Sequence, residues 1–248
     1  MLVGLKPEEN LAKLAENSYP GRGIIVGTDE MSKCVQVYWI MGRSENSRNR
    51  IFSCQEGRVF TEAANPSKMT DPSLVIYNAM DECGGSNFIV SNGDQTDTVV
   101  QAIVADSRST LRTALVGREF EPDQPNFTPR ITGLCRIRKD GTCFTELSIL
   151  KYCGILRGHC ARYYYEYDQI LPIAGYCLTT YVGDGNPLPS YVGEPYLMPL
   201  YGDAQEILDT YWEALNKENR IALVVKVIDP KSRRSEILIK NRFQKVDT

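Results

Sequence analysis

The sequence contains very little histidine, with one residue, His159, in a chain of 248. This scarcity excludes a multi-histidine metal site and makes a zinc hydrolase an unsuitable interpretation, since catalytic zinc is usually held by several histidines. A Ser-His-Asp triad would depend on His159, which no nucleophile-elbow motif accompanies. We interpret His159 as a surface or half-buried residue and expect no metal site.

Other common signals are also missing. The chain has no GxGxxG or GxxxxGK[ST] loop, so a Rossmann or P-loop nucleotide site has little support. No apolar run reaches the roughly 18 residues of a membrane span, and the N-terminus is too charged for a signal peptide. The eight cysteines form no CxxC pair. We therefore expect a reduced cytoplasmic protein with free thiols and no membrane partner.

The overall composition is that of a folded protein. Hydrophobic residues make up 42% of the chain and charged residues 24%, which allows a packed core and argues against disorder. The formal net charge is −3, with a pI near 5.4. General nucleic-acid binders are normally basic, so we expect no nucleic-acid partner. A local basic cluster can still bind a small anionic ligand.

The hydrophobic pattern places strands in runs, with helices between the runs. The clearest helix is expected over 202–220, where Asp203 is a candidate N-cap. Helical spacing over 97–120 indicates one or two helices around Ser107. The remaining expected elements are a short helix at 6–17, a helix or strand at 73–82, and strands within 23–29, 34–42, 86–97, 125–150, 162–185, 221–230 and 234–243.

This order of elements predicts an α+β fold with largely antiparallel sheets, because an alternating βαβ pattern is missing. We expect one domain over 1–248, with 1–20 as an N-terminal helical extension. The aromatic run RYYYEYD at 162–168 is interpreted as core or as a subunit contact.

A cluster of arginines follows the apolar strand predicted at 34–42. Arg43, Arg48 and Arg50 lie among serines and asparagines, including Asn49. Arginine offers a planar fork that matches phosphate or carboxylate in two-point contacts. The cluster therefore predicts a clamp for a phosphorylated ligand or, alternatively, a solvated hairpin tip.

Two further polar stretches also interrupt apolar segments. Tyr77 and Asn78 lie within VIYNAM, where a tyrosine hydroxyl is either a proton donor or a core group bonded to the backbone. In IVSNGDQTD, Asn92 and Gly93 form a turn, and Asp94, Thr96 and Asp97 are candidate caps of a helix that begins near Thr98. A helix N-terminus is also an anion site. Turn and cap alone would equally explain this second stretch.

A fourth stretch, EFEPDQPNFTPRI at 119–131, combines carboxylates, amides and three prolines. Proline restricts a loop and helps to hold a carboxylate such as Glu121 in one direction. Thr128 and Arg130 close the stretch before the next strand. A solvated acidic loop is the alternative interpretation.

Taken in order, these stretches resemble the archaeal-type IMP cyclohydrolases. The matching residues are Gly42-Arg43 with Asn49-Arg50, Tyr77-Asn78, Val90 to Asp97, Glu119 to Asp123, and Thr128 to Ile131. The resemblance covers about Gly21 to Arg136, and the C-terminal half is not matched by it. It implies a four-layer αββα sandwich like that of the N-terminal-nucleophile hydrolases. A terminal nucleophile is not expected, because the chain starts with Met1-Leu2.

The resemblance also implies an activity. It is the closure of 5-formamidoimidazole-4-carboxamide ribonucleotide to inosine monophosphate with loss of water, the last step of purine synthesis. Carried over by position, the catalytic residues are Arg50, Tyr77 and Glu121. The reaction moves neither electrons nor a carried group, so no cofactor is expected. The candidate substrate-binding residues are Arg43, Arg48, Asn49, Asn78, Asn92, Gly93, Asp97, Thr128 and Arg130.

The partner implied is a small purine ribonucleotide, and a homo-oligomer is compatible with the sequence. The chain departs from the family pattern at Asp94 and Gln95, where the family has serine and histidine, and its arginine loop is about two residues longer. These departures leave open a cyclohydrolase or amidohydrolase with a shifted substrate. A nucleotide-binding regulatory homologue without turnover is the other alternative.

Overall fold

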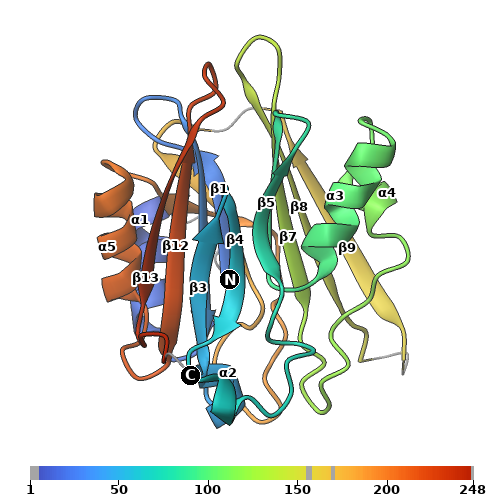
Figure 1. The fold of residues 1–248 in the computed structure, drawn as a ribbon, viewed down its shortest axis with the longest axis vertical. Coiled ribbons are helices and arrows are strands. Elements are labelled where there is room, and N and C mark those ends of the chain that lie inside the picture. The colour runs from blue at the N-terminus through green and yellow to red at the C-terminus, as the bar shows by residue number, and fades with distance from the viewer. Residues whose placement is uncertain (1–5, 155–157, 169–170, 247–248) are drawn as a thin grey trace.

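The computed structural model describes residues 6–154, 158–168 and 171–246 (Figure 1). Met1 and Leu2, considered above as a terminus, lie outside these ranges. The chain forms two antiparallel sheets. The first has six strands in the order β11-β10-β1-β2-β12-β13. Its strands are β1 (Gly23–Thr28), β2 (Cys34–Met41), β10 (Ala174–Thr179), β11 (Tyr196–Pro199), β12 (Arg220–Ile228) and β13 (Ser235–Asn241).

The second sheet has seven strands, and their spatial order follows the chain order from β3 to β9. Each strand therefore pairs with its sequence neighbour, and the connections can be short. The strands are β3 (Arg50–Gln55), β4 (Arg58–Ala63), β5 (Asn78–Cys83), β6 (Asn87–Ser91), β7 (Arg130–Ile137), β8 (Cys143–Tyr152) and β9 (Cys160–Tyr167).

Helices lie on the outer face of each sheet, so that the layers run helix, sheet, sheet, helix (Figure 1). The six-stranded sheet carries α1 (Pro7–Glu16) and α5 (Ala204–Ala214), which Asp203 caps as expected. The seven-stranded sheet carries α3 (Gln95–Ala105) and α4 (Leu111–Ala114). Two short elements, α2 (Glu45–Arg48) and the 3-10 helix η1 (Pro66–Lys68), lie in loops. Within the described residues, no helix is long and apolar enough to cross a membrane.

The main core lies between the two sheets. All residues of β1 and β2 are buried, which explains why both strands are almost continuously apolar. Trp39 of β2 points outward and stacks on Tyr211 of α5, with ring centroids 6.3 Å apart. Gly23 is required beneath this pair, because a Cβ there would lie 2.0 Å from the Trp39 ring.

The α+β class and the antiparallel sheets predicted from the sequence are confirmed. The hairpin of β1 and β2 forms as expected, with Gly23 opposite Trp39. Helical spacing over 97–120 resolves into two helices, α3 and α4, on either side of Ser107. The ambiguous segment 73–82 becomes a strand only from Asn78, because the preceding prolines and turns hold a loop.

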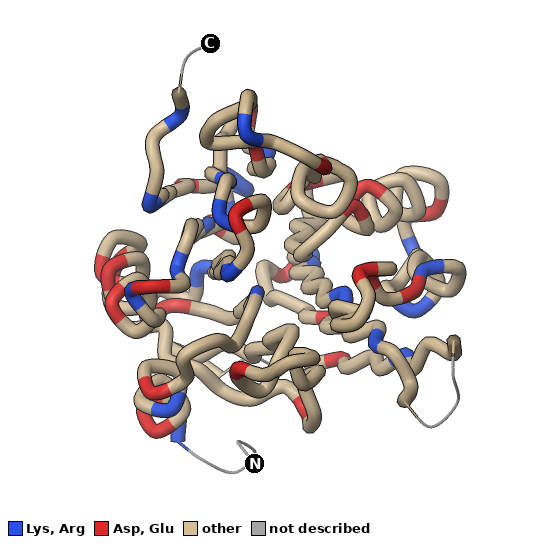
Figure 2. The backbone as a smooth tube through the Cα atoms, turned by 90° about the horizontal axis from the view of Figure 1, so that it is seen from below, with Lys and Arg blue, Asp and Glu red and all other residues tan. Residues whose placement is uncertain are grey.

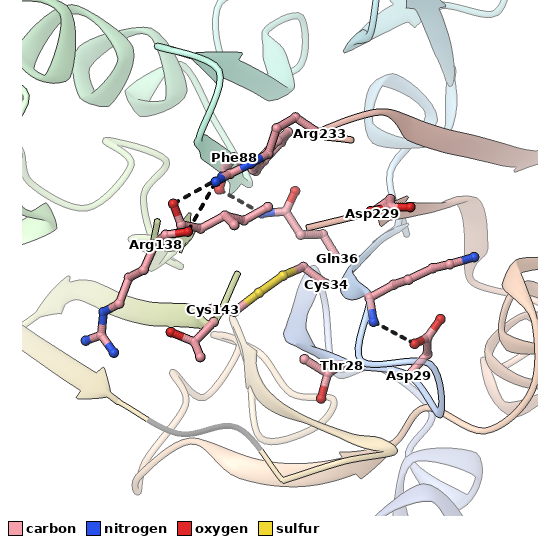
Figure 3. The surroundings of a disulfide bond; sticks show 12 residues. Thr28, Asp29, Cys34, Gln36, Phe88, Arg138, Cys143, Asp229 and Arg233 are labelled. Carbon is pink, nitrogen blue, oxygen red and sulfur yellow. Dashed lines mark hydrogen bonds between the residues drawn. A yellow bond between two sulfur atoms is a disulfide. The ribbon is translucent and has the colours of Figure 1, made fainter. Parts of the chain in front are cut away.

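The expectation that every cysteine is a free thiol is wrong for one pair. A disulfide joins Cys34, at the start of β2, to Cys143, at the start of β8, and links the two sheets (Figure 3). The sulfur of Cys135 lies within 4.8 Å of both. The two bonded cysteines are 109 residues apart in the sequence, and only the stacking of the sheets brings them together. A local motif therefore could not reveal this bond.

Thiol counting tests this bond. Unfolded in denaturant without reductant, the protein should present six thiols to a thiol-reactive dye, because Cys34 and Cys143 are joined. After reduction, all eight cysteines should react. A count of eight before reduction would contradict the disulfide, and peptide mapping would identify the pair.

Candidate functional site

Arg50 lies at the start of β3, directly after the short helix α2. Ser44 caps α2 by accepting a hydrogen bond from Ser47 N, and the chain then turns Arg50 inward. The Arg50 side chain is fully buried, and its Nε donates to Ser47 O at 2.8 Å. Its two terminal nitrogens have no hydrogen-bond partner among the described residues. A buried guanidinium without partners is costly, so it indicates a place for an oxygen-bearing ligand or water.

Tyr77 lies just before β5 and is 7% exposed. Thr61 of β4 fixes its backbone, because Thr61 N donates to Tyr77 O and Tyr77 N donates to Thr61 Oγ1. The Tyr77 hydroxyl lies 2.6 Å from the Tyr38 hydroxyl of β2. Burial and the neighbouring Tyr77 raise the pKa of Tyr38 well above its usual value. The Tyr38 phenol is therefore neutral at neutral pH and shares a hydrogen bond with Tyr77.

Glu121 lies in the loop before β7 and is 2% exposed. Arg22 Nη2 donates to both of its oxygens, at 2.7 and 2.6 Å. Burial raises the pKa of Glu121, and the charges of Arg22 and Arg130 partly offset that rise. Burial would lower the pKa of Arg22, but Glu121 raises it well above its usual value. The pair thus holds a carboxylate and a guanidinium together inside the protein.

The structure brings the three sequence-predicted catalytic residues to one centre. Arg22 and Arg50 both act on the Tyr38 hydroxyl, where their positive charges partly offset the rise of its pKa. Tyr77 is bonded to that same hydroxyl, and together with Glu121 it raises the pKa of Arg22. The centre therefore runs from Arg50 through the two tyrosines to the Arg22–Glu121 pair.

The other two arginines of the cluster line a surface cavity of about 560 Å³, together with Asn49, which precedes Arg50 in the chain. Arg43 forms an ion pair with Asp184, and its guanidinium lies 4.9 Å from the Tyr19 ring centroid. Arg48 donates to Asn219 Oδ1 at 3.2 Å. The cavity is lined by Arg43, Glu45, Arg48, Asn49, Ala64, Asn65, Lys68, Phe243, Gln244 and Val246.

The tip of the arginine loop is exposed, as the hairpin-tip alternative requires, but Arg50 is not part of that exposed tip. Asn49 holds the loop shut at its base, because its Nδ2 donates to Asn65 O and its Oδ1 accepts from Asn65 N. Lys68 of η1 adds a third cation to the cavity. Figure 2, which views the end of the molecule where α2 lies, shows basic and acidic residues interspersed. The excess of basic residues is confined to this cavity, which suits the binding of a small anion there.

Asn92 and Gly93 form the turn between β6 and α3. Asn92 is fully buried, donates to Pro129 O and accepts from Ile131 N, so it ties this turn to the start of β7. A Cβ at Gly93 would lie 2.6 Å from Arg130 Nη1. Glycine is therefore needed for the close approach of that guanidinium.

Arg130 Nη1 is bonded by the two residues at which the sequence departs from the family pattern. It donates to Asp94 Oδ1 at 2.6 Å and to Gln95 Oε1 at 2.8 Å. Arg118 also forms an ion pair with Asp94. Burial raises the pKa of Asp94, but the two arginines outweigh it and leave the pKa below its usual value. Arg130 already has an anionic partner within the protein.

The remaining predicted residues make internal hydrogen bonds. Asn78 Nδ2 donates to Asp97 Oδ1 at 2.8 Å, which joins the start of β5 to the first turn of α3. The Thr128 hydroxyl bonds to Asp123 and to the Tyr181 hydroxyl. These contacts position the loop that carries Glu121, since Glu121 N donates to Thr128 O.

Sequence reasoning missed Arg22, Tyr38 and Tyr19, which complete the centre. Arg22 lies in YPGRG, which indicates only a turn between two elements, and Tyr38 lies inside an apolar strand. Burial raises the pKa of Tyr19, while three guanidinium groups, those of Arg22, Arg50 and Arg43, act against that rise. The single available signal was the position of Arg22, an arginine directly before an apolar segment that reads as a buried strand.

The fold and centre define a class of protein: a double-sheet α+β protein with arginine, tyrosine and glutamate buried around one point. In a comparison with protein families, residues 19–232 match the family of IMP cyclohydrolase-like proteins. The chain belongs to this family. The match extends well beyond the segment 21–136 on which the sequence resemblance rests. No curated protein matches the sequence.

Proposed function

We propose that the protein is an IMP cyclohydrolase, which closes 5-formamidoimidazole-4-carboxamide ribonucleotide to inosine monophosphate with loss of water. Membership of the family supports a cyclohydrolase-type activity. One observation supports the specific reaction most directly: buried Arg50, Tyr77 and Glu121 are linked through Tyr38 and Arg22, which each respond to two of the three.

In the proposed first step, the substrate carboxamide nitrogen attacks the carbon of its own formyl group. A C–N bond forms, the carbonyl electron pair moves to the formyl oxygen, and the nitrogen loses a proton to Glu121. A carboxylate with a raised pKa is a suitable acceptor near neutral pH. Holding the two substrate groups in contact removes much of the entropic barrier.

In the second step, the new alkoxide must leave as water. Tyr77 donates its proton toward this oxygen and is itself held by Tyr38 at 2.6 Å. Arg50 stabilises the negative charge, since its terminal nitrogens have no other described partner. The proton that Glu121 accepted in the first step passes to the resulting hydroxyl group, which leaves as water. The C=N bond forms as the C–O bond breaks, and the N–H proton of the formamido nitrogen returns to the Tyr77 oxygen. Arg22 positions Glu121 and leaves lone pairs on both carboxylate oxygens free to accept.

We further propose that the cavity lined by Arg43, Arg48 and Lys68 holds the substrate phosphate. Arg130 is a weaker candidate, because Asp94 and Gln95 already bond its guanidinium. Asn78, Asn92, Gly93, Asp97 and Thr128 then act mainly by shaping the walls. No metal or organic cofactor takes part in this proposal.

The layer order supports a fold of the N-terminal-nucleophile hydrolase type, used here as one domain with residues 1–20 as an extension. The proposed chemistry uses the buried centre, with no terminal nucleophile. We place the protein in the cytoplasm as an enzyme of purine biosynthesis. The disulfide is unusual for that compartment, where thiols are normally reduced.

The direct test is to incubate the purified protein with the formamido ribonucleotide and follow inosine monophosphate by absorbance. Formation of the product at a rate proportional to enzyme supports the proposal. Tight binding of inosine monophosphate without turnover would instead indicate the regulatory homologue. Neither binding nor turnover would point to a shifted substrate, for which the Asp94–Arg130 pair is the structural reason.

Replacing Arg48 by glutamine tests the phosphate site. The substitution removes a cation from the cavity but keeps an amide that can donate to Arg43 O, as Arg48 Nε does at 3.3 Å. We expect KM to rise about tenfold with kcat nearly unchanged, because a phosphate contact stabilises substrate and transition state alike. Arg108→Gln, on a side chain that is 89% exposed, is the control and should leave KM unaltered. An unchanged KM in Arg48→Gln would place the phosphate elsewhere.

A further inference from the structure

Two of the four edges of the sheets, at β11 and β3, are protected by an identifiable contact. At β11, helix α1 covers the edge, and Asn10 Nδ2 donates to Leu197 O at 2.8 Å. At β3, the side chain of Asn241 bonds both the N–H and the C=O of Phe52, each at 2.9 Å. This second contact also joins β3 to β13, across the two sheets. Such covers prevent a strand edge from pairing with another chain.

The edge of β9 has no such cover. Between residues 162 and 167, no backbone group bonds to any described segment other than β8. Nearer the start of the strand, Cys160 O accepts only from the side chain of Arg162, at 3.3 Å. Among the described residues, β9 is thus a well-formed strand of eight residues with an open edge.

The sequence of β9, CARYYYEY, also lacks the residues that usually discourage edge pairing. It contains no proline, lysine or glycine, and no β-bulge interrupts its pairing with β8. Its four tyrosines favour strands and are enriched in protein interfaces. Tyr163 is 45% exposed. The aromatic run interpreted from the sequence as core or subunit contact is therefore an edge strand with a partly exposed aromatic face.

The two charges of β9 are arranged symmetrically about its centre. Arg162 and Glu166 lie two residues before and two residues after Tyr164, so all three project from the same face of the strand. Arg162 Nη2 donates to Arg118 O at 2.9 Å and lies 3.8 Å from a carboxylate oxygen of Glu119, so these two contacts are what Arg162 exchanges on pairing. Glu166 is exposed and forms no ion pair with a described residue. A carboxylate is thus available at the edge.

We propose that a second copy of this chain pairs antiparallel with β9 through a two-fold axis at Tyr164. This register places Arg162 of each copy opposite Glu166 of the other, which gives two cross-strand ion pairs. On the other face, Tyr163 of each copy lies opposite Tyr165 of the other. Opposite charges and aromatic pairs directly across an antiparallel ladder both stabilise it. The two seven-stranded sheets become one continuous sheet across the dimer.

The self-complementary charge pattern favours a second copy over an unrelated peptide strand. A two-fold interface must match each residue with its own symmetry mate, and an isologous contact uses the same patch twice. A strand with two arginines or two glutamates at these positions would repel itself. β9 carries one of each at equal distance from the axis.

Sedimentation velocity across the micromolar range tests the proposal. The wild-type protein should sediment as a species of twice the 27.9 kDa chain mass. Arg162→Glu and Glu166→Arg should each weaken dimerisation about tenfold or more, because each turns both ion pairs into repulsive contacts. An equimolar mixture of the two variants should dimerise again, since every facing pair in the mixed dimer is then of opposite charge.

Arg108→Glu, a charge reversal on a fully solvated loop, is the matched control and should dimerise like the wild type. Circular dichroism and thermal unfolding verify that each variant is folded. A wild-type monomer throughout this range would overturn the proposal. So would single variants that dimerise normally, or a mixture that stays monomeric, because either result separates self-association from the β9 charges.

Discussion

Replacing Tyr77 by phenylalanine is expected to reduce kcat about 10²-fold or more while leaving the affinity for inosine monophosphate nearly unchanged. The ring remains in its buried place, and only the hydroxyl that bonds Tyr38 is removed. The loss falls on turnover because the hydroxyl donates to an oxygen whose charge develops during the reaction. Steady-state kinetics and calorimetry with the product measure the two quantities separately.

Tyr38→Phe is the matched control for this prediction. It removes the other half of the same 2.6 Å hydrogen bond but leaves the Tyr77 hydroxyl in place. We expect a much smaller loss of kcat, since Tyr38 positions the donor and does not act on the substrate. Equal losses in the two variants would show that the pair acts through structure alone, and normal turnover in Tyr77→Phe would refute the assigned role.

Replacing Glu121 by glutamine is expected to reduce kcat by about 10²- to 10⁴-fold, because the amide cannot accept the carboxamide proton. It also leaves the buried Arg22 guanidinium without its charged partner, so stability should fall as well. Thermal unfolding measures that second effect. Activity assays below the melting temperature then separate catalysis from folding.

The pH profile gives a further check on Glu121. In the proposed mechanism the ionised carboxylate accepts the proton, so kcat/KM should rise with pH as this group loses its proton. Burial raises the pKa of Glu121, so the acid limb should lie above the value near 4.3 that is typical of an exposed glutamate. A limb at the ordinary value would argue that another group is the base. In Glu121→Gln, the limb should disappear.

Most strands and the main helices could be predicted because their patterns are local, whereas the short strands β3, β4 and β11 were not expected. The buried β2 reads as an apolar run, and α5 has an N-cap and a clear apolar face. The spacing over 97–120 indicated one or two helices around Ser107, and the structure has two. Propensity and periodicity are enough where neighbouring residues decide the outcome.

Contacts between the sheets could not be predicted in this way. The bonds from Arg22 to Glu121 and from Tyr38 to Tyr77 join residues 99 and 39 positions apart. The Cys34–Cys143 disulfide spans 109. Each contact depends on how one sheet stacks on the other, which no window of sequence contains. The motifs therefore predicted half of the centre, and the packing supplied the rest.

The centre draws its groups from both sheets, and this has a consequence for how the protein tolerates change. Tyr38 lies in the six-stranded sheet and Arg22 directly precedes its strand β1, whereas Arg50 begins β3 of the seven-stranded sheet and Tyr77 directly precedes β5. A small shift of one sheet relative to the other would therefore change the positions of all four side chains relative to one another. Substitutions in the main core between the two sheets should therefore reduce activity even where the chain still folds.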